Sequence, residues 1–219
     1  MKKYELTAEF IEKWGKKLFR IKALIGFGSV EAGELGGYVE KEDNLAQNGN
    51  AWVYDNAWVC GDARVYDNAR VYGDARVYDN ARVYGDARVY DNARVCGDAW
   101  VCGNARVCGD ARVCGDARVC GDAWVCGDAW VCGDADYLLI GRIGSRFGFT
   151  TFFKNKEKGI TVSCGCFLGT IAEFRAKVTD THGDNKHAKM YNMAADMAEL
   201  QILGEEHFDK LNTNKSEPF

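Results

Sequence analysis

A pattern of apolar and polar positions that repeats every six residues occupies the middle of the chain. From Ala51 to Asp134 the sequence runs through 14 hexads without an insertion, beginning AWVYDN, AWVCGD, ARVYDN. Ala always holds the first position and Val the third, so both point to the same side of an extended strand. Arg or Trp at the second position and Tyr or Cys at the fourth point to the other side, and Gly, Asp and Asn in the last two suit a turn. The repeat predicts a solenoid of short strands around a thin Ala and Val core.

This hexad, with a small residue two places before an aliphatic one, resembles the repeat of left-handed parallel β-helices. The resemblance implies a left hand and triangular coils of three hexads, so that residue i stacks on residue i+18. One face would then carry a column of Arg between Trp52 and Trp124, and it is interpreted either as a solvated surface or as a face that docks a protein or a planar anion. The same stacking places cysteines in three columns, which are Cys96, Cys114 and Cys132, then Cys108 and Cys126, then Cys102 and Cys120. We expect these thiols to stay reduced, because the chain opens without a secretory signal and Tyr fills the same position in other hexads.

The pattern changes on both sides of the repeat, which predicts four segments. Residues 1–50 are expected to cap the first coil, with a helix over 8–14 capped by Thr7, a strand over 18–25 and an irregular opening coil. The solenoid covers 51–136, and a small α+β module covers 137–204. A polar tail follows over 205–219. The predicted fold class is mainly β: a parallel β-helix between a cap and an α+β module.

Within the module the predicted order is three strands and two helices. The strands are expected over 137–143, 149–153 and 160–167. The letters TIAE at 170–173 form a capping box for a helix that ends near His182. Asp184 can cap a second helix that runs to about Leu203, where Gly204 ends it.

The candidate site residues lie in this module, because only there do polar residues vary in a way that could carry function. Ser145 and Arg146, in a turn flanked by glycines, could bind an anion through backbone N–H groups and the guanidinium, although an ordinary turn has the same composition. The other candidate ligand-binding residues are Thr150, Thr151, His182 and Asn185.

Metal and nucleophile chemistry have weaker support in the module. Cys164, Cys166 and His182 offer three zinc ligands, one fewer than a closed structural site needs, and no catalytic residue, metal or cofactor is predicted. Cys166 with His182 as a nucleophile pair lacks an identifiable group to orient the histidine.

Charge and hydropathy narrow the function classes. The formal net charge of −4 falls within the repeat, where 13 Asp outnumber nine Arg, and the pI near 5.5 argues against a general nucleic-acid binder. No run of apolar residues reaches the length of a membrane span, and the first residues lack the apolar core of a signal peptide. These observations predict a cytoplasmic protein.

Many hexapeptide-repeat proteins are trimeric acyltransferases, and their active site uses a histidine on the coils. This chain has no histidine between residues 51 and 134, and all three of its histidines lie beyond the repeat. An acyltransferase is therefore kept only as a minor alternative.

The segment GELGGYVEKEDNLAQNGNAWVYDNA, the ARVYGDARV array and the stretch from IGSRFGFTTFF to THGDNKHA resemble repeat proteins that phages and prophages encode. The resemblance implies a virus-linked role. We predict a non-enzymatic binding protein whose solenoid is a scaffold and whose module recognises a partner. It would form a homo-oligomer, a dimer or a trimer, and counter host defence by sequestering a nucleotide-type signal or blocking a host protein. The alternative is a structural protein, a component of a virion or of its assembly, in place of a binding protein.

Overall fold

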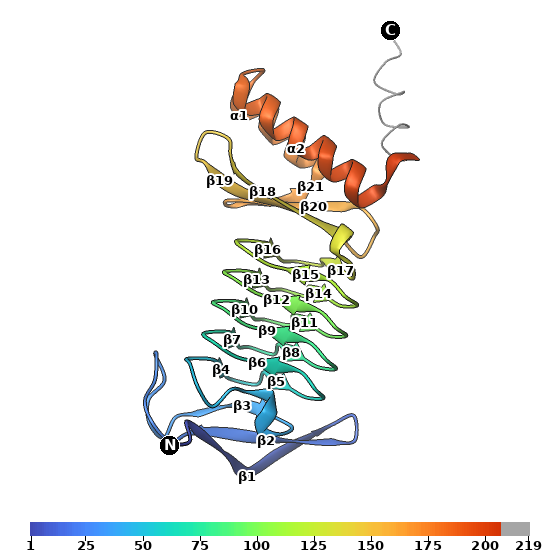
Figure 1. The fold of residues 1–219 in the computed structure, drawn as a ribbon. Coiled ribbons are helices and arrows are strands. Elements are labelled where there is room, and N and C mark those ends of the chain that lie inside the picture. The colour runs from blue at the N-terminus through green and yellow to red at the C-terminus, as the bar shows by residue number, and fades with distance from the viewer. Residues whose placement is uncertain (207–219) are drawn as a thin grey trace. The chain divides into compact units, whose positions relative to one another are not determined.

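The structure, a computed structural model, describes residues 1–206 and contains two compact units, residues 1–128 and the chain from 129 onward (Figure 1). The first unit holds the cap and the stacked coils of the solenoid, and the second holds the end of the repeat and the α+β module. The polar tail expected over 205–219 lies outside the described residues from 207 on. Among the described residues, neither helix combines the length and apolar character that a membrane span requires.

The hexads build a β-solenoid, as the repeat predicts. Each hexad contributes one two-residue strand at its second and third positions. In the first unit these are β4 (Trp52–Val53), β5 (Trp58–Val59), β6 (Arg64–Val65), β7 (Arg70–Val71), β8 (Arg76–Val77), β9 (Arg82–Val83), β10 (Arg88–Val89), β11 (Arg94–Val95), β12 (Trp100–Val101), β13 (Arg106–Val107), β14 (Arg112–Val113), β15 (Arg118–Val119) and β16 (Trp124–Val125).

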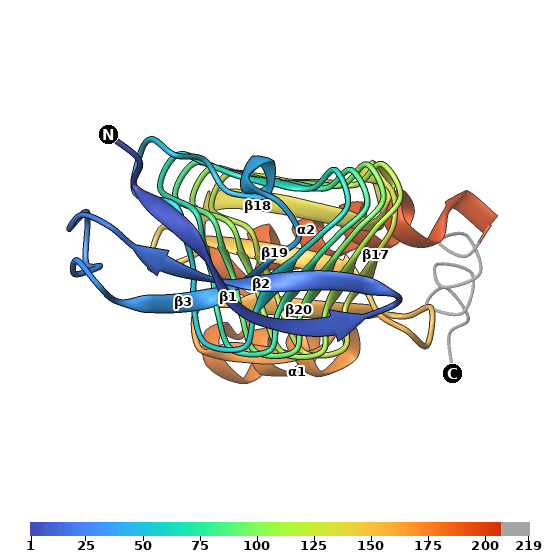
Figure 2. The same cartoon turned by 90° about the horizontal axis from the view of Figure 1, so that it is seen from below.

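These strands form three parallel columns, ordered β4-β7-β10-β13-β16, β5-β8-β11-β14 and β6-β9-β12-β15. Within each column, the residues of one strand pair with those 18 positions on in the next, as Val89 pairs with Val107. The view in Figure 2 shows the coils superimposed around one shared interior. Ala and Val fill that interior; Ala87 and Val89, for example, are fully buried. The prediction of three-hexad coils is therefore confirmed.

The corners of the coils follow a rule that alternates along the sequence. In every hexad but the last, the fifth residue has a positive φ, 61° at Asp79 and 68° at Gly97, a region that Gly and Asp tolerate better than most residues. The Asp79 carboxylate accepts a hydrogen bond from the Gly97 N–H (3.2 Å), and the Asn80 amide donates to Asp98 (3.0 Å). Each DN corner therefore bonds to the GD corner one coil further on.

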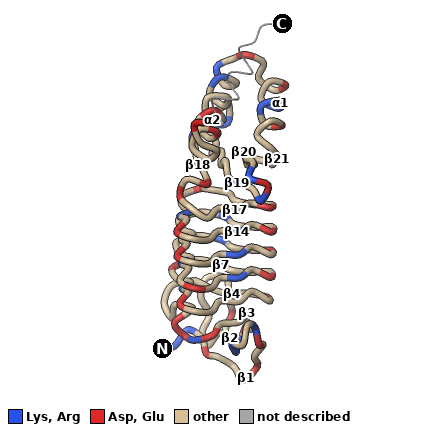
Figure 3. Tube along the Cα trace, turned by 90° about the vertical axis from the view of Figure 1, so that its right-hand side faces the viewer, with Lys and Arg blue, Asp and Glu red and all other residues tan. Residues whose placement is uncertain are grey.

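The outer faces of the solenoid carry ladders of aromatic rings and cations. Tyr66 stacks on Tyr84 at 4.9 Å between ring centroids, and the guanidiniums of Arg82 and Arg118 lie over the Trp100 ring at 5.2 and 4.8 Å. Figure 3 shows arginines and aspartates recurring coil after coil. This is the stacking of guanidinium on aromatic rings that the sequence suggests.

The expectation that all the ladder thiols stay reduced is wrong for four of them, because Cys114 and Cys132 are disulfide-bonded, as are Cys102 and Cys120. Cys102 and Cys120 form a disulfide, with Cα atoms 4.6 Å apart. Both follow directly on paired strands, and the one-coil register places their Cα atoms within the range that a disulfide spans. Other cysteines at the same hexad position, Cys96 and Cys108, are free thiols.

The cap is a hairpin and not a helix followed by a strand. β1 (Tyr4–Lys13) pairs antiparallel with β2 (Lys16–Ala23), which pairs with β3 (Leu35–Val39), and β3 runs parallel to β5. The helix expected over 8–14 is therefore wrong. Pairing with β2, with Phe10 opposite Phe19, keeps this segment extended, and few of its side chains are buried, so its own pattern does not indicate a strand. The strand expected over 18–25 is confirmed as β2. A short 3₁₀ turn, η1 (Glu42–Asn44), leads into the irregular opening coil.

A buried lysine closes the first coil. The Lys3 side chain is 2% exposed, and its ammonium donates to the carbonyl oxygens of Ala51 (3.0 Å) and Asn48 (3.3 Å). The Phe27 ring lies 4.8 Å from the same nitrogen. Burial lowers the pKa of Lys3 to about 8.

The second unit is a sheet covered by two helices. After β17 (Trp130–Val131) and the 3₁₀ turn η2 (Asp134–Asp136), an antiparallel sheet is ordered β18 (Tyr137–Ile143), β19 (Gly148–Lys154), β20 (Ile160–Cys164) and β21 (Phe167–Thr170). The helices α1 (Ile171–His182) and α2 (Lys186–Leu203) lie on one face of this sheet (Figure 1). Phe152, Val162 and Phe174 form the centre of their shared core.

Two module predictions need correction. The strand expected over 160–167 is two strands, because Gly165 takes a φ of 60° and turns the chain so that Cys164 pairs with Phe167. The module order is therefore ββββαα. The α2 cap is Asn185 and not Asp184, since the Asn185 side-chain oxygen accepts from the backbone N–H groups of His187 (2.8 Å) and Ala188 (3.2 Å). The capping box between Thr170 and Glu173 is confirmed.

Candidate functional site

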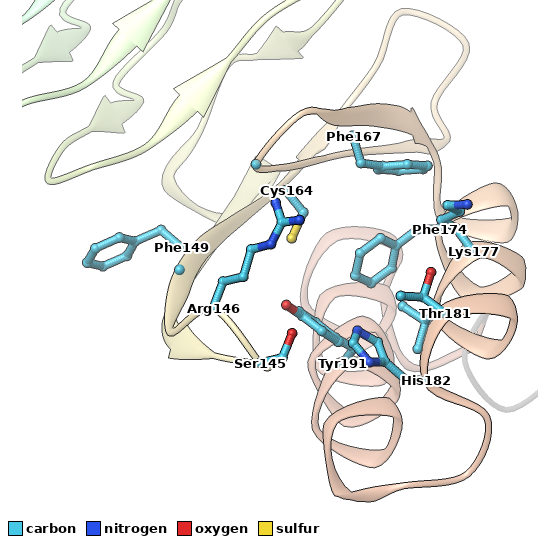
Figure 4. Close-up of a pocket in the computed structure, with 13 residues that line it drawn as sticks. Ser145, Arg146, Phe149, Cys164, Phe167, Phe174, Lys177, Thr181, His182 and Tyr191 are labelled. Atoms are coloured by element: carbon cyan, nitrogen blue, oxygen red, sulfur yellow. The ribbon is translucent and has the colours of Figure 1, made fainter.

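A pocket of about 220 Å³ opens in the module between two turns of the sheet and the two helices (Figure 4). The β18–β19 turn, the β20–β21 turn, α1 and α2 each contribute side chains to it. The lining residues are Ser145, Arg146, Gly148, Phe149, Cys164, Gly165, Phe167, Phe174, Lys177, Val178, Thr181, His182 and Tyr191.

The β18–β19 turn is held against α2 by a glycine. Gly144 has a φ of 73°, and a Cβ atom placed on it would overlap the Tyr191 hydroxyl. No residue with a side chain fits this contact without displacing the tyrosine. Ser145 and Arg146 follow directly, so the close approach at Gly144 sets where both enter the pocket.

The polar lining of the pocket is positively charged. Arg146 comes from the β18–β19 turn and Lys177 from α1, while Ser145 and Thr181 add hydroxyl groups. No Asp or Glu of the described chain is among the lining residues. Lys177 also donates to Asp180 at 3.1 Å in an exposed pair, which contributes little because water screens it. The pocket therefore favours an anion.

The rest of the lining is aromatic. Phe174 meets Tyr191 edge to face at 5.7 Å between ring centroids and lies 5.6 Å from Phe167. The His182 ring stacks on Tyr191 at 5.7 Å with 28° between the planes. Figure 4 shows Phe167 and Phe174 on the far side of the pocket from Ser145. Flat apolar walls of this kind suit a ring system.

A hydrogen-bonded thiol joins the two sides of the pocket. Thr150 Oγ1 donates to Cys164 Sγ at 3.2 Å, and the Tyr191 hydroxyl is hydrogen-bonded to the same thiol. Burial raises the pKa of Tyr191, the neighbouring thiol adds to this, and Arg146 acts in the opposite direction. Tyr191 therefore keeps its proton at neutral pH and can donate a hydrogen bond.

The structure brings some of the residues expected from the sequence together and separates others. Ser145, Arg146 and His182 line the pocket. Thr150 lies behind the lining, bonded to Cys164, and Asn185 serves as the cap of α2.

Two further candidates take no part in the lining. Thr151 is a buried residue of β19, and Cys166 is exposed in the β20–β21 turn. Across residues 1–206 no three His, Cys, Asp or Glu side chains are grouped so that they could hold a metal ion, so Cys164, Cys166 and His182 do not form a ligand set.

Several lining residues were not expected from the sequence. Phe174, Lys177, Val178 and Thr181 come from α1 at spacings of three and four, which places them on one side of a helix. That spacing was readable in the sequence, but only the packing of α1 shows that this side faces the turn at Ser145.

Comparison with known proteins finds similarity in the repeat. The family described as "YdcK Beta solenoid repeat" matches residues 63–77, 75–89, 87–103, 105–120 and 111–127. A protein of Escherichia coli (strain K12) named "Uncharacterized acetyltransferase YdcK" is 41% identical over 63 residues. That match covers 25% of this chain and 19% of the E. coli protein, so the chain spans about a fifth of its relative's length. The family match and the fold together make this a repeat β-helix protein, and the pocket lies outside the residues matched by the family.

Proposed function

We propose that this is a binding protein that takes a small anionic ligand with a flat ring system in the module pocket, with the solenoid as its scaffold. One observation carries the proposal: Arg146 and Lys177 border a pocket whose other walls are aromatic and whose described lining has no carboxylate. An anion entering there meets the guanidinium of Arg146 and the ammonium of Lys177, which Asp180 partly neutralises, and no carboxylate among the described lining residues.

The two sides of the pocket suit the two parts of a nucleotide-type ligand. A guanidinium binds phosphate or carboxylate oxygens through paired N–H groups, so Arg146 would hold the anionic end. Phe167 and Phe174 offer faces and edges against which a base can pack. The volume of about 220 Å³ is small for a ligand pocket and favours a single ring system over a dinucleotide.

The surroundings of the pocket thiol support binding over nucleophilic chemistry. Cys164 is hydrogen-bonded to the hydroxyls of Thr150 and Tyr191. Neither hydroxyl is a base at neutral pH, so the two groups bonded to the thiol do not take its proton, although Arg146 and His182 line the same pocket.

The resemblance to phage and prophage repeat proteins suggests a role for such binding. A phage protein that sequesters a nucleotide-type signal would counter host defence without catalysis. Blocking a host protein through the same module is the other form of that role. Infection assays with and without a functional pocket separate both from a structural part of the virion, because only the binding roles need Arg146.

The test is a calorimetric titration of the full chain with adenosine 5′-monophosphate, compared with adenosine. We expect the monophosphate to bind more tightly, and Arg146→Ala to weaken it by roughly ten- to a hundredfold, the loss of a charge-assisted hydrogen bond. Arg142→Ala is the matched control, since Arg142 is an exposed arginine of β18 outside the lining. Equal affinity for both probes, or an Arg146→Ala variant that binds like Arg142→Ala, would contradict the proposal.

Acetyl transfer is the second candidate, and the printed name of the E. coli relative favours it. The same preparations should therefore be incubated with acetyl-coenzyme A and a panel of amines and alcohols. We expect no release of free coenzyme A above background. Release that His182→Ala abolishes would replace binding with transfer, since His182 is the histidine that lines the pocket.

A further inference from the structure

Helix α2 has a second apolar face on the side opposite the core. Its inner side packs through residues such as Ala195 and Ala198, which are fully buried. Its outer side carries four large apolar side chains that are 40–65% exposed, here called the Met stripe. These are Met190, Met193, Met197 and Leu200. A helix that is apolar on both sides usually has a partner on each.

The spacing of the Met stripe is that of a helix–helix seam. Its intervals of three, four and three residues match the a and d positions of a heptad. The intervals also read the same in both directions. A twofold axis at the middle of the stripe would therefore place Met193 beside the partner's Met197, and Met190 beside the partner's Leu200.

The charges at the two ends of α2 favour an antiparallel arrangement. Lys186 and Lys189 lie at its N-terminal end and outnumber Asp184, which precedes the helix, and Glu205 and Glu206 follow its C-terminal end. An antiparallel pair brings unlike charges together at both ends, whereas a parallel pair brings like charges together. The helix dipoles also oppose each other favourably in the antiparallel pair.

We propose that α2 packs against α2 of a second copy of this chain, antiparallel, through the Met stripe. Methionine suits such a seam because its unbranched side chain adapts to its neighbour. An 18-residue helix is only about 27 Å long. The pair therefore buries less than a standard interface of about 800 Å² per partner, and the dimer forms in roughly the micromolar range.

The test is sedimentation equilibrium of the full chain from about 1 to 100 μM, a range that brackets such a dissociation constant. We expect the wild type to form a dimer as its concentration rises. Met193→Glu should weaken dimerisation at least tenfold, so that this variant is largely monomeric over the same range, because the new carboxylate would face an apolar seam. Leu168→Glu is the matched control, since Leu168 is similarly exposed (51%) but lies on β21. It should dimerise like the wild type, and circular dichroism shows whether each variant is folded.

A charge reversal tests the orientation. Lys186→Glu with Lys189→Glu should weaken the dimer, and adding Glu205→Lys and Glu206→Lys to the same chain should restore it. Failure of the fourfold variant to restore the dimer overturns the antiparallel arrangement. A wild-type monomer throughout the range, or a dimer that Met193→Glu leaves intact, overturns the seam. A monomer that Met193→Glu destabilises would show that the chain covers its own stripe.

Discussion

Lys3 illustrates how a single residue solves a problem of the solenoid. The end of a coil stack leaves backbone carbonyl oxygens without the strand that would bond them, and the ammonium of Lys3 bonds two of them in a buried position. The cost is desolvation of the charge, which lowers the pKa of Lys3 to about 8. No periodic pattern in the sequence predicts that Lys3 is buried, and only the path of the chain under the first coil shows it.

The lowered pKa has a direction that can be measured. Below pH 8 Lys3 is charged in both the folded and the unfolded state; between about 8 and the usual 10.5 it is charged only when unfolded. The unfolded state then binds more protons, so the free energy of unfolding rises with pH in this window.

Above pH 8, we expect the free energy of unfolding of the wild type to rise relative to that of Lys3→Met by up to about 1.4 kcal/mol per pH unit. Below pH 8, the difference between the two proteins should stay constant. Urea denaturation of both proteins at several pH values gives that difference. Lys22→Met, at an exposed lysine, should run parallel to the wild type throughout. Parallel curves for Lys3→Met as well would show that Lys3 is not desolvated.

At the scale of elements, the corners of the coils are as specific as the strands. Each DN corner combines a positive φ with a carboxylate that bonds the next coil, and each GD corner supplies the N–H that this carboxylate needs. The repeat alone predicts where the corners lie because Asp, Asn and Gly recur there. It does not predict that Asp79 bonds the backbone of Gly97, because that contact depends on which hexads stack.

Substitution at Asp79 separates the two contributions of a corner. Asp79→Ala loses the hydrogen bond to Gly97 and places a Cβ at positive φ, at a cost of about 2 kcal/mol. Asp79→Gly loses only the bond, so its urea midpoint should lie between those of Asp79→Ala and the wild type. Asp184→Ala, at an exposed aspartate that caps nothing, should leave the midpoint unchanged. Identical midpoints for Asp79→Ala and Asp79→Gly would remove backbone strain from the explanation.

The elements outside the repeat show where sequence reasoning is limited. The α1 start was predictable because Thr170 and Glu173 are local neighbours that bond each other. β1 was not, because its extended form depends on a strand that follows it and not on its own pattern. In the pocket, Ser145 and Arg146 could be predicted from the glycine-flanked turn that holds them. Tyr191 could not, because only the packing of α2 places it beside that turn.

At the scale of the whole molecule, each of the two units has its own core. The solenoid interior is Ala and Val stacked in columns, and the module interior is a cluster of aromatic and aliphatic side chains around Phe152. The core of the solenoid could be predicted residue by residue, because the repeat itself places Ala and Val at the inward positions. The core of the module depends on contacts between a sheet and two helices that are distant in sequence.

Separate cores predict separate unfolding transitions in calorimetry. Phe152→Ala removes a fully buried ring of the module and should lower its free energy of unfolding by about 3–5 kcal/mol. We expect one transition to move to lower temperature while the transition of the solenoid stays in place. Phe147→Ala, at a ring that is 71% exposed, is the control and should move neither. A joint shift of all the heat absorption would show that the two units unfold as one.

The alternation of corners also limits how a solenoid of this kind can change length. DN and GD hexads alternate in sequence over residues 51–98, and a coil contains an odd number of hexads, so each DN corner meets a GD corner one coil on. Duplicating a single coil there would put two DN corners in contact, with a carboxylate beside a carboxylate at the join. Duplicating two coils restores the match. Gene duplication can therefore lengthen the solenoid within residues 51–98 and keep every corner matched only by two coils at a time, or roughly 10 Å. The later hexads are nearly all GD, so that part of the solenoid accepts any whole number of added coils.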